Sequence, residues 1–308
     1  MKIFILIIVS FMFLNFNSIA QCCSAGNPVG GDGTQSVLNK NDLSVNLYFK
    51  HSLSKDYYHL DKKTKVPYEY YSYYDFNYLS LTYGLFPRLS LYSELGYFYN
   101  KTQQITINNE KEIIRSNGLG DLLLSFRYRL IQTVKPVSQL IASCGIKIPV
   151  GPFNEEIDGI IIPVSLQPSS GAFKLNTGLF YSRKRLEKKT GWYSFVFFEY
   201  SNIIEKGYLT YKYGNFFQFS LAGTYSILKN LTAIGSIKME WREKDKREVG
   251  IKIESSGSKI VYFCPQVLYI ISNKWYVTAI VDLPFYKYIN GYQLTNKLSY
   301  QLGIRKDF

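Results

Sequence analysis

The chain has 308 residues, of which 46% are hydrophobic, 19% charged and 17% aromatic, with a formal net charge of +13. This wealth of apolar and aromatic side chains excludes a disordered chain, and two histidines and four cysteines argue against a metal centre, a redox protein or a cofactor. Mean hydropathy is −0.09. After residue 20 no apolar run approaches the ~18 to 20 residues that a spanning helix needs, so a helical membrane bundle is also excluded. A large β protein remains.

Residues 1–20 are typical of a cleaved secretory signal peptide. Lys2 supplies the positive charge, residues 3–14 the apolar core, and Ser18-Ile19-Ala20 the cleavage site. Residues 21–41 then form a Gly-rich segment that we expect to be flexible, and it begins with Cys22 and Cys23. The two cysteines are interpreted first as part of a mobile tail. Lipidation of Cys22, disfavoured by Gln21 before it, and a thiol pair for metal capture or exchange are the alternatives.

From residue 42 to 308 apolar and polar residues alternate, the pattern of strands with two different faces. In residues 215–227, Phe217, Phe219 and Leu221 share one face, while Gln218 and Ser220 share the other. Such a sheet either packs against a second sheet or forms a barrel whose apolar face meets lipid and whose polar face lines a lumen.

Twelve strands are predicted. Their ranges are 42–51, 70–84, 88–99, 117–131, 138–150, 172–184, 191–203, 211–227, 232–244, 258–271, 275–288 and 295–308. Most exceed the ~5 to 6 residues of a globular strand and reach the ~9 to 11 needed to cross a bilayer at a tilt. Strand length therefore favours a membrane barrel over a soluble sandwich.

The links between the predicted strands alternate in length. They are short near Pro87, Lys135, Glu187, 228–231 and 272–273, and mostly longer at 52–69, 100–116, 151–171 and 245–257. Outer-membrane barrels have short periplasmic turns and long outer loops, so both ends of this chain are placed in the periplasm. Phe308, on the apolar face of the last strand, is typical of the C-terminal signal for outer-membrane assembly. The sequence thus predicts one all-β domain over 42–308, a transmembrane antiparallel up-and-down barrel of about twelve strands.

Three short motifs carry a resemblance. They are Gly118-Leu119-Gly120-Asp121, the run Leu166-Gln167-Pro168-Ser169-Ser170-Gly171, and the run Leu283-Pro284-Phe285-Tyr286-Lys287-Tyr288-Ile289-Asn290-Gly291-Tyr292-Gln293-Leu294 with Gly303-Ile304 and Phe308 after it. Over residues 117–308 the chain resembles the outer-membrane transporter family named for the MetA pathway of phenol degradation. The resemblance implies a barrel that passes small, often hydrophobic or aromatic, molecules.

Charged residues on the polar faces are the candidate lumen lining, because a charge facing lipid costs ~2 to 4 kcal/mol near the midplane. They are Glu94, Asp121, Arg127, Arg129, Lys147, Lys238, Glu240, Arg242, Asp282, Arg305 and Asp307. Two interpretations stay open: rings of charge that select solutes, or ion pairs that fill a narrow barrel. Cys144 is expected to face lipid and Cys264 the lumen.

A barrel hydrolase is the least favoured alternative. A triad needs a base for its nucleophile, and only His51 and His59 are available, both expected at or beyond the outer end of the first strand. No G-x-S-x-G motif is present. We therefore expect no enzyme, no metal and no cofactor.

The sequence favours a passive outer-membrane channel of a Gram-negative bacterium for small molecules; a plugged structural or interaction barrel is the alternative. Expected partners are outer-membrane lipid, lipopolysaccharide near the outer lysines, the assembly machinery and an unidentified small solute. Nucleic acid is excluded for a secreted barrel despite the basic charge.

Overall fold

The computed structural model describes residues 36–308, except 67–68, 108–109, 158, 186, 207–208 and 248–249. Residues 1–35 lie outside the described part, and with them the predicted signal peptide, Cys22 and Cys23. Within the described residues no helix is long and apolar enough to span a membrane.

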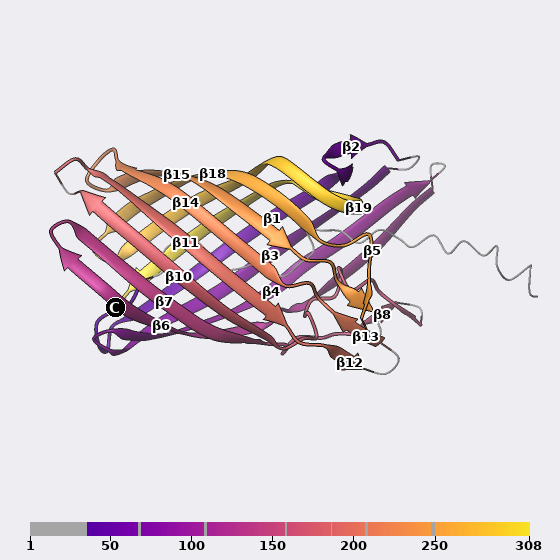
Figure 1. The fold of residues 1–308 in the computed structure, drawn as a ribbon, viewed down its shortest axis with the longest axis horizontal. Helices are drawn as coiled ribbons and strands as arrows, with labels where there is room; N and C mark the ends of the chain where they lie inside the picture. The colour runs from indigo at the N-terminus through magenta and orange to yellow at the C-terminus, as the bar shows by residue number, and fades with distance from the viewer. Residues whose placement is uncertain are drawn as a thin grey trace, which may run out of the picture.

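The regular structure is a closed antiparallel barrel with strongly tilted strands (Figure 1). The wall strands are β1 Leu43–Leu60, β3 Glu69–Phe86, β4 Leu89–Ile107, β5 Glu110–Leu119, β6 Leu122–Val134, β7 Val137–Ile148, β10 Lys174–Arg185, β11 Thr190–Ser201, β14 Phe216–Ser226, β15 Leu231–Arg242, β18 Ser258–Ser272 and β19 Trp275–Asp307. The sheet closes where β19 pairs with β1. A closed sheet leaves no free edge, which a barrel in lipid requires.

The closed path through the described residues has eleven elements, β2 and β5 being additional strands of the sheet. The sequence predicts about twelve strands. The difference between the two numbers arises in β19, which covers two of the predicted strands, 275–288 and 295–308. Its 33 residues fold back on themselves, since the Asp307 N–H donates to the Lys274 carbonyl over 2.9 Å and Gly291 has a φ of 61°. The first arm pairs with β18 and the second with β1.

Short turns gather at one end of the barrel and long connections at the other, as predicted (Figure 1). The turns at 87–88, 135–136, 187–189, 227–230 and 273–274 lie at the end where the chain also terminates. The opposite end carries small strands: β2 Lys62–Thr64, β8 Glu156–Ile157, β9 Ile160–Ile161, β12 Ile204–Lys206, β13 Leu209–Lys212, β16 Lys246–Arg247 and β17 Ile251–Lys252. We call these the short-turn end and the long-loop end.

The two faces of the strands differ as the alternation predicts. In β14, Leu221 is 48% exposed on the outside, whereas Gln218 and Ala222 are 4% and 2% exposed on the inside. Cys144 is exposed and Cys264 buried, so the prediction that they occupy opposite faces is confirmed, and both are free thiols. The outer wall is an extended apolar surface, far beyond the patches that soluble monomers expose.

Two predicted boundaries are wrong at the long-loop end. β1 runs to Leu60 rather than to residue 51, and the supposed loop 100–116 is occupied mostly by β4 and β5. The added stretches have polar side chains on both faces, as in Asn100 to Gln104. An apolar face is absent because the wall there rises above the apolar belt, so alternation does not signal the strand.

Candidate functional site

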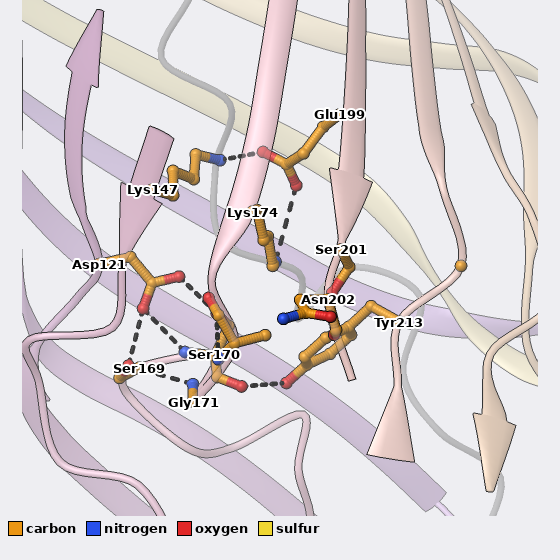
Figure 2. A network of polar contacts seen from close by, with 12 residues as sticks. Asp121, Lys147, Ser169, Ser170, Gly171, Lys174, Glu199, Ser201, Asn202 and Tyr213 are labelled. Carbon is orange, nitrogen blue, oxygen red and sulfur yellow. Dashed lines mark hydrogen bonds and ion pairs between the residues drawn. The ribbon is translucent and has the colours of Figure 1, made fainter. Parts of the chain in front are cut away.

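The inside of the barrel holds the charged side chains that the sequence singles out. Near the long-loop ends of their strands, Lys147 on β7 contacts Glu199 on β11, with Nζ 2.7 Å from Oε2 (Figure 2). Lys174 on β10 lies 3.6 Å from the other carboxylate oxygen. The three side chains are 4–6% exposed, and the pair Lys147–Glu199 spans β10, so all three occupy the concave face.

A second charged cluster lies on the wall made by β15, β18 and β19. Lys238 Nζ is 3.1 Å from both Asp282 Oδ2 and Glu240 Oε1, and Lys50 from β1 lies 3.8 Å from the same Asp282 oxygen. Lys238 also lies 4.5 Å from the centre of the Tyr262 ring. Two cations and two anions are thus balanced within this cluster.

Other predicted lumen residues lie against aromatic rings or near the short-turn end. Arg127 lies 3.7 Å from the Tyr92 ring centre, and the Tyr92 hydroxyl donates to Glu94. Arg242 lies 4.9 Å from the Phe216 ring. At the short-turn end Arg305 pairs with Asp307 over 3.4 Å, and Ser44 donates to Asp307 over 2.7 Å. Arg129 donates to the Val37 carbonyl and, over 2.9 Å, to Gln132.

Three charged residues of this lining are not among those predicted from the sequence: Glu199, Lys174 and Lys50. Glu199 stands in the run Phe195-Val196-Phe197-Phe198-Glu199-Tyr200, where aromatic residues occupy both faces and hide the alternation. Along β11, Glu199 alternates in step with Phe195, Phe197 and Ser201, which are all buried. This spacing is the signal that could have placed Glu199 inside.

A stretch of chain between β9 and β10, residues 162–172, folds into the lumen, and we call it the inward loop. Leu166, Gln167 and Ser169 are each at most 2% exposed. Gln167 accepts from the N–H of Glu155, which precedes β8, and donates to the Ile162 carbonyl within the loop, over 3.0 Å in both cases. Lys101 Nζ donates to the Gln167 carbonyl over 2.7 Å, and Ser116 donates to the Leu166 carbonyl.

Asp121 is the main attachment of the inward loop to the wall (Figure 2). Its carboxylate accepts from Ser169 Oγ at 2.7 Å, from the Ser170 N–H at 2.9 Å and from Ser170 Oγ at 2.6 Å. Gly171 turns the loop with a φ of 67°, and a Cβ there would lie 2.6 Å from the Phe153 ring. The motifs 118–121 and 166–171, far apart in sequence, therefore form one contact.

Tyr213, between β13 and β14, closes the other side of this contact. Its hydroxyl donates to the Ser170 carbonyl over 3.1 Å. Burial, with the nearby carboxylates of Asp121 and Asp245, raises the pKa of Tyr213 well above its ordinary value. The phenol therefore keeps its proton and its bond to the loop at any physiological pH.

Two hollows of the lumen are lined by described residues. One, the mouth hollow, lies at the short-turn end, and the other lies deeper. Both lie along β14, β15, β18 and β19: Thr224 and Thr232 line the mouth hollow, whereas Ser220 and Lys238 line the deeper one. Tyr193 borders both hollows.

The two histidines lie within β1 and not in a solvated loop, because that strand is longer than predicted. His51 Nδ1 is 2.7 Å from Asp75 Oδ1, and the His51 ring stacks on Tyr300. His59 stacks on Tyr292 with ring centres 4.5 Å apart. His51 has the same strand parity as the exposed Leu47 and so faces away from the lumen. Within the described residues, no group of three or more His, Cys, Asp or Glu side chains could hold a metal.

Comparison with known proteins gives a fold match and no sequence match. No protein-family model and no curated protein matches the chain. The crystal structure of the COG4313 outer membrane channel from Pseudomonas putida F1 is similar with a TM-score of 0.72 at 14% identity, covering 92% of this chain and all of that one. The translocator domain of the autotransporter NalP from Neisseria meningitidis matches at 0.48 with 8% identity, covering 90% of this chain and 91% of its own. The KdgM porin matches at 0.46 with 10% identity, covering 85% of this chain and 99% of its own.

Proposed function

We propose that the protein is a narrow passive channel for small molecules in the outer membrane of a Gram-negative bacterium. One observation carries the proposal: a closed barrel that is apolar outside encloses buried charges and hollows. Eight strands are just filled by side chains and sixteen leave an open channel, so this barrel lies between these limits. Its similarity to the COG4313 channel supports the same architecture.

We also propose that the protein is one of the channels named for the MetA pathway of phenol degradation. This assignment is supported by the motifs 118–121 and 166–171, which meet at Asp121 and Ser170. The solute is proposed only as a small molecule able to pass an aromatic and charged lumen. Export by a cleaved signal peptide, assembly through Phe308, whose side chain is exposed beside Lys306, and contact with lipopolysaccharide complete the proposal.

The plugged structural barrel is the second candidate, and the inward loop is the observation in its favour. The loop enters the lumen from the long-loop end, and Leu166, Gln167 and Ser169 in it are nearly inaccessible. Single-channel recording of the refolded protein in a planar bilayer separates the two candidates. A channel gives discrete conductance steps that depend on solute size, whereas a permanent plug gives none at any voltage or solute.

Membrane insertion is tested by a matched pair of arginine substitutions on exposed leucines. Leu221→Arg puts a charge on the outer face of β14, where it should cost about 2 to 4 kcal/mol of unfolding free energy in lipid vesicles. Leu228→Arg, in the turn at 227–230, should cost about 0 to 1 kcal/mol because that end reaches water. Denaturant unfolding in vesicles measures both, and equal costs would argue against a lipid-facing wall at Leu221.

A further inference from the structure

Six residues ahead of β1 occupy the inside of the barrel at its short-turn end. Residues 36–41 are expected from the sequence to be flexible, but in the structure they run along the inner wall, and we call them the strap. Val37 is 5% exposed and belongs to an apolar cluster with Ile141, Phe180, Phe195, Phe197 and Phe216. Its carbonyl accepts from Arg129, and the Leu38 N–H donates to Ser90 Oγ over 2.9 Å.

The strap has a base next to β1 and a part farther from β1, residues 36–38, which we call the tip. At the base, the Asn41 N–H donates to the Gly84 carbonyl over 2.8 Å, and the Gly84 N–H donates to the Asp42 carbonyl over 2.9 Å. The backbones approach so closely that a Cβ on Gly84 would lie 1.7 Å from the Asn39 carbonyl oxygen. Among the described residues, the Val37 side chain and two hydrogen bonds hold the tip.

The tip also lies beside the residue that borders both hollows. Ser36 borders the mouth hollow, and Tyr193, which borders both hollows, packs against the cluster that contains Val37. Moving the tip would widen the space between the hollows while the base stays attached. Asn41 has a φ of 68°, so the chain already turns sharply between tip and β1.

We infer that the strap is a gate: its tip closes the passage at the short-turn end when Val37 is seated and opens it by swinging out about Asn41. This inference rests on the proposed channel function and adds its regulation. In the closed state, Val37 packs in the aromatic cluster of β10 and β11, and hydrogen bonds from Arg129 and to Ser90 hold the tip. The barrel wall does not move in either state.

Two sets of variants test the gate in planar bilayers. Val37→Asp places a carboxylate among apolar side chains, which burial disfavours strongly, so the tip should leave its seat and the open-channel fraction should rise several-fold. Val37→Leu, the matched control, keeps an apolar tip and should behave as the natural protein. If Val37→Asp fails to fold, as judged by gel mobility before and after boiling, the second set decides.

The second set locks the same molecule in one state. Leu38→Cys with Ser90→Cys is made after replacing all native cysteines (Cys22→Ser, Cys23→Ser, Cys144→Ser, Cys264→Ser). The Leu38–Ser90 bond puts the two Cα atoms within the roughly 4.4–6.8 Å that a disulfide spans. The oxidised protein should be closed, and reduction should restore conductance in the same bilayer. Equal conductance before and after reduction would overturn the gate. Silence of every variant, including Asp121→Ala, would instead overturn the channel function.

Discussion

Replacing Asp121 with alanine is expected to raise the single-channel conductance, because it detaches the inward loop from the barrel wall. The substitution removes an acceptor of three hydrogen bonds from Ser169 and Ser170. Bonds to a charged group contribute about 1.5 to 3 kcal/mol each, so the loop should lose on the order of 3 kcal/mol or more of its docking free energy. Conductance and the size limit for neutral polymers in a planar bilayer measure the widening.

A double variant of the loop serines and a control variant accompany Asp121→Ala. The double change Ser169→Ala with Ser170→Ala attacks the same contact from the loop side, so adding it to Asp121→Ala should give little further increase. Thr177→Ala removes an exposed hydroxyl on the outer face of β10 and should leave conductance unchanged. If Asp121→Ala and the natural protein have the same conductance and size limit, the inward loop is not the constriction.

The second large effect is expected at Glu199. Glu199→Gln leaves Lys147 and Lys174 without their shared carboxylate at side-chain exposures of 5% and 4%. Breaking a buried ion pair by removing one partner costs about 3 to 5 kcal/mol, since the remaining charge is uncompensated. The free energy of unfolding in vesicles should fall by that amount, and reversal potentials in a salt gradient should shift toward anions because two cations remain.

A charge-free version of the same cluster distinguishes the ionic cost from lost packing. The triple change Lys147→Met, Lys174→Met and Glu199→Leu should recover most of the stability, as apolar replacements of buried ion networks often do. The shift in selectivity should disappear as well. A triple variant as unstable as Glu199→Gln would mean that the cluster stabilises the barrel through packing and not through charge.

Alternation was enough to predict the barrel because its physical cause is local. Every strand between lipid and lumen must present unlike faces, and β14 shows both, with Leu221 outside and Gln218 inside. The same rule explains why Cys144 and Cys264 lie on opposite faces. The order of short and long links follows from the antiparallel hairpins, so the ends of the barrel could be told apart from sequence.

The candidate site was harder to predict because its decisive contacts join distant segments. No periodic pattern indicates that Ser170 returns to Asp121, 49 residues earlier in the chain, or that the strap enters the mouth. Glu199 was missed since aromatic residues fill both faces of its strand. Such contacts depend on the curvature of the whole barrel, which brings β7 and β11 together across β10.

The closure of the sheet by β1 and β19 has a consequence for how the protein folds. Ser44 and Asp307 bond across 263 residues of chain, so the seam is the least local pairing and bears the largest loop-closure entropy. Until it forms, β1 and β19 present unpaired backbone groups that can template pairing with other chains. The seam is therefore where a variant that folds slowly or aggregates should be sought.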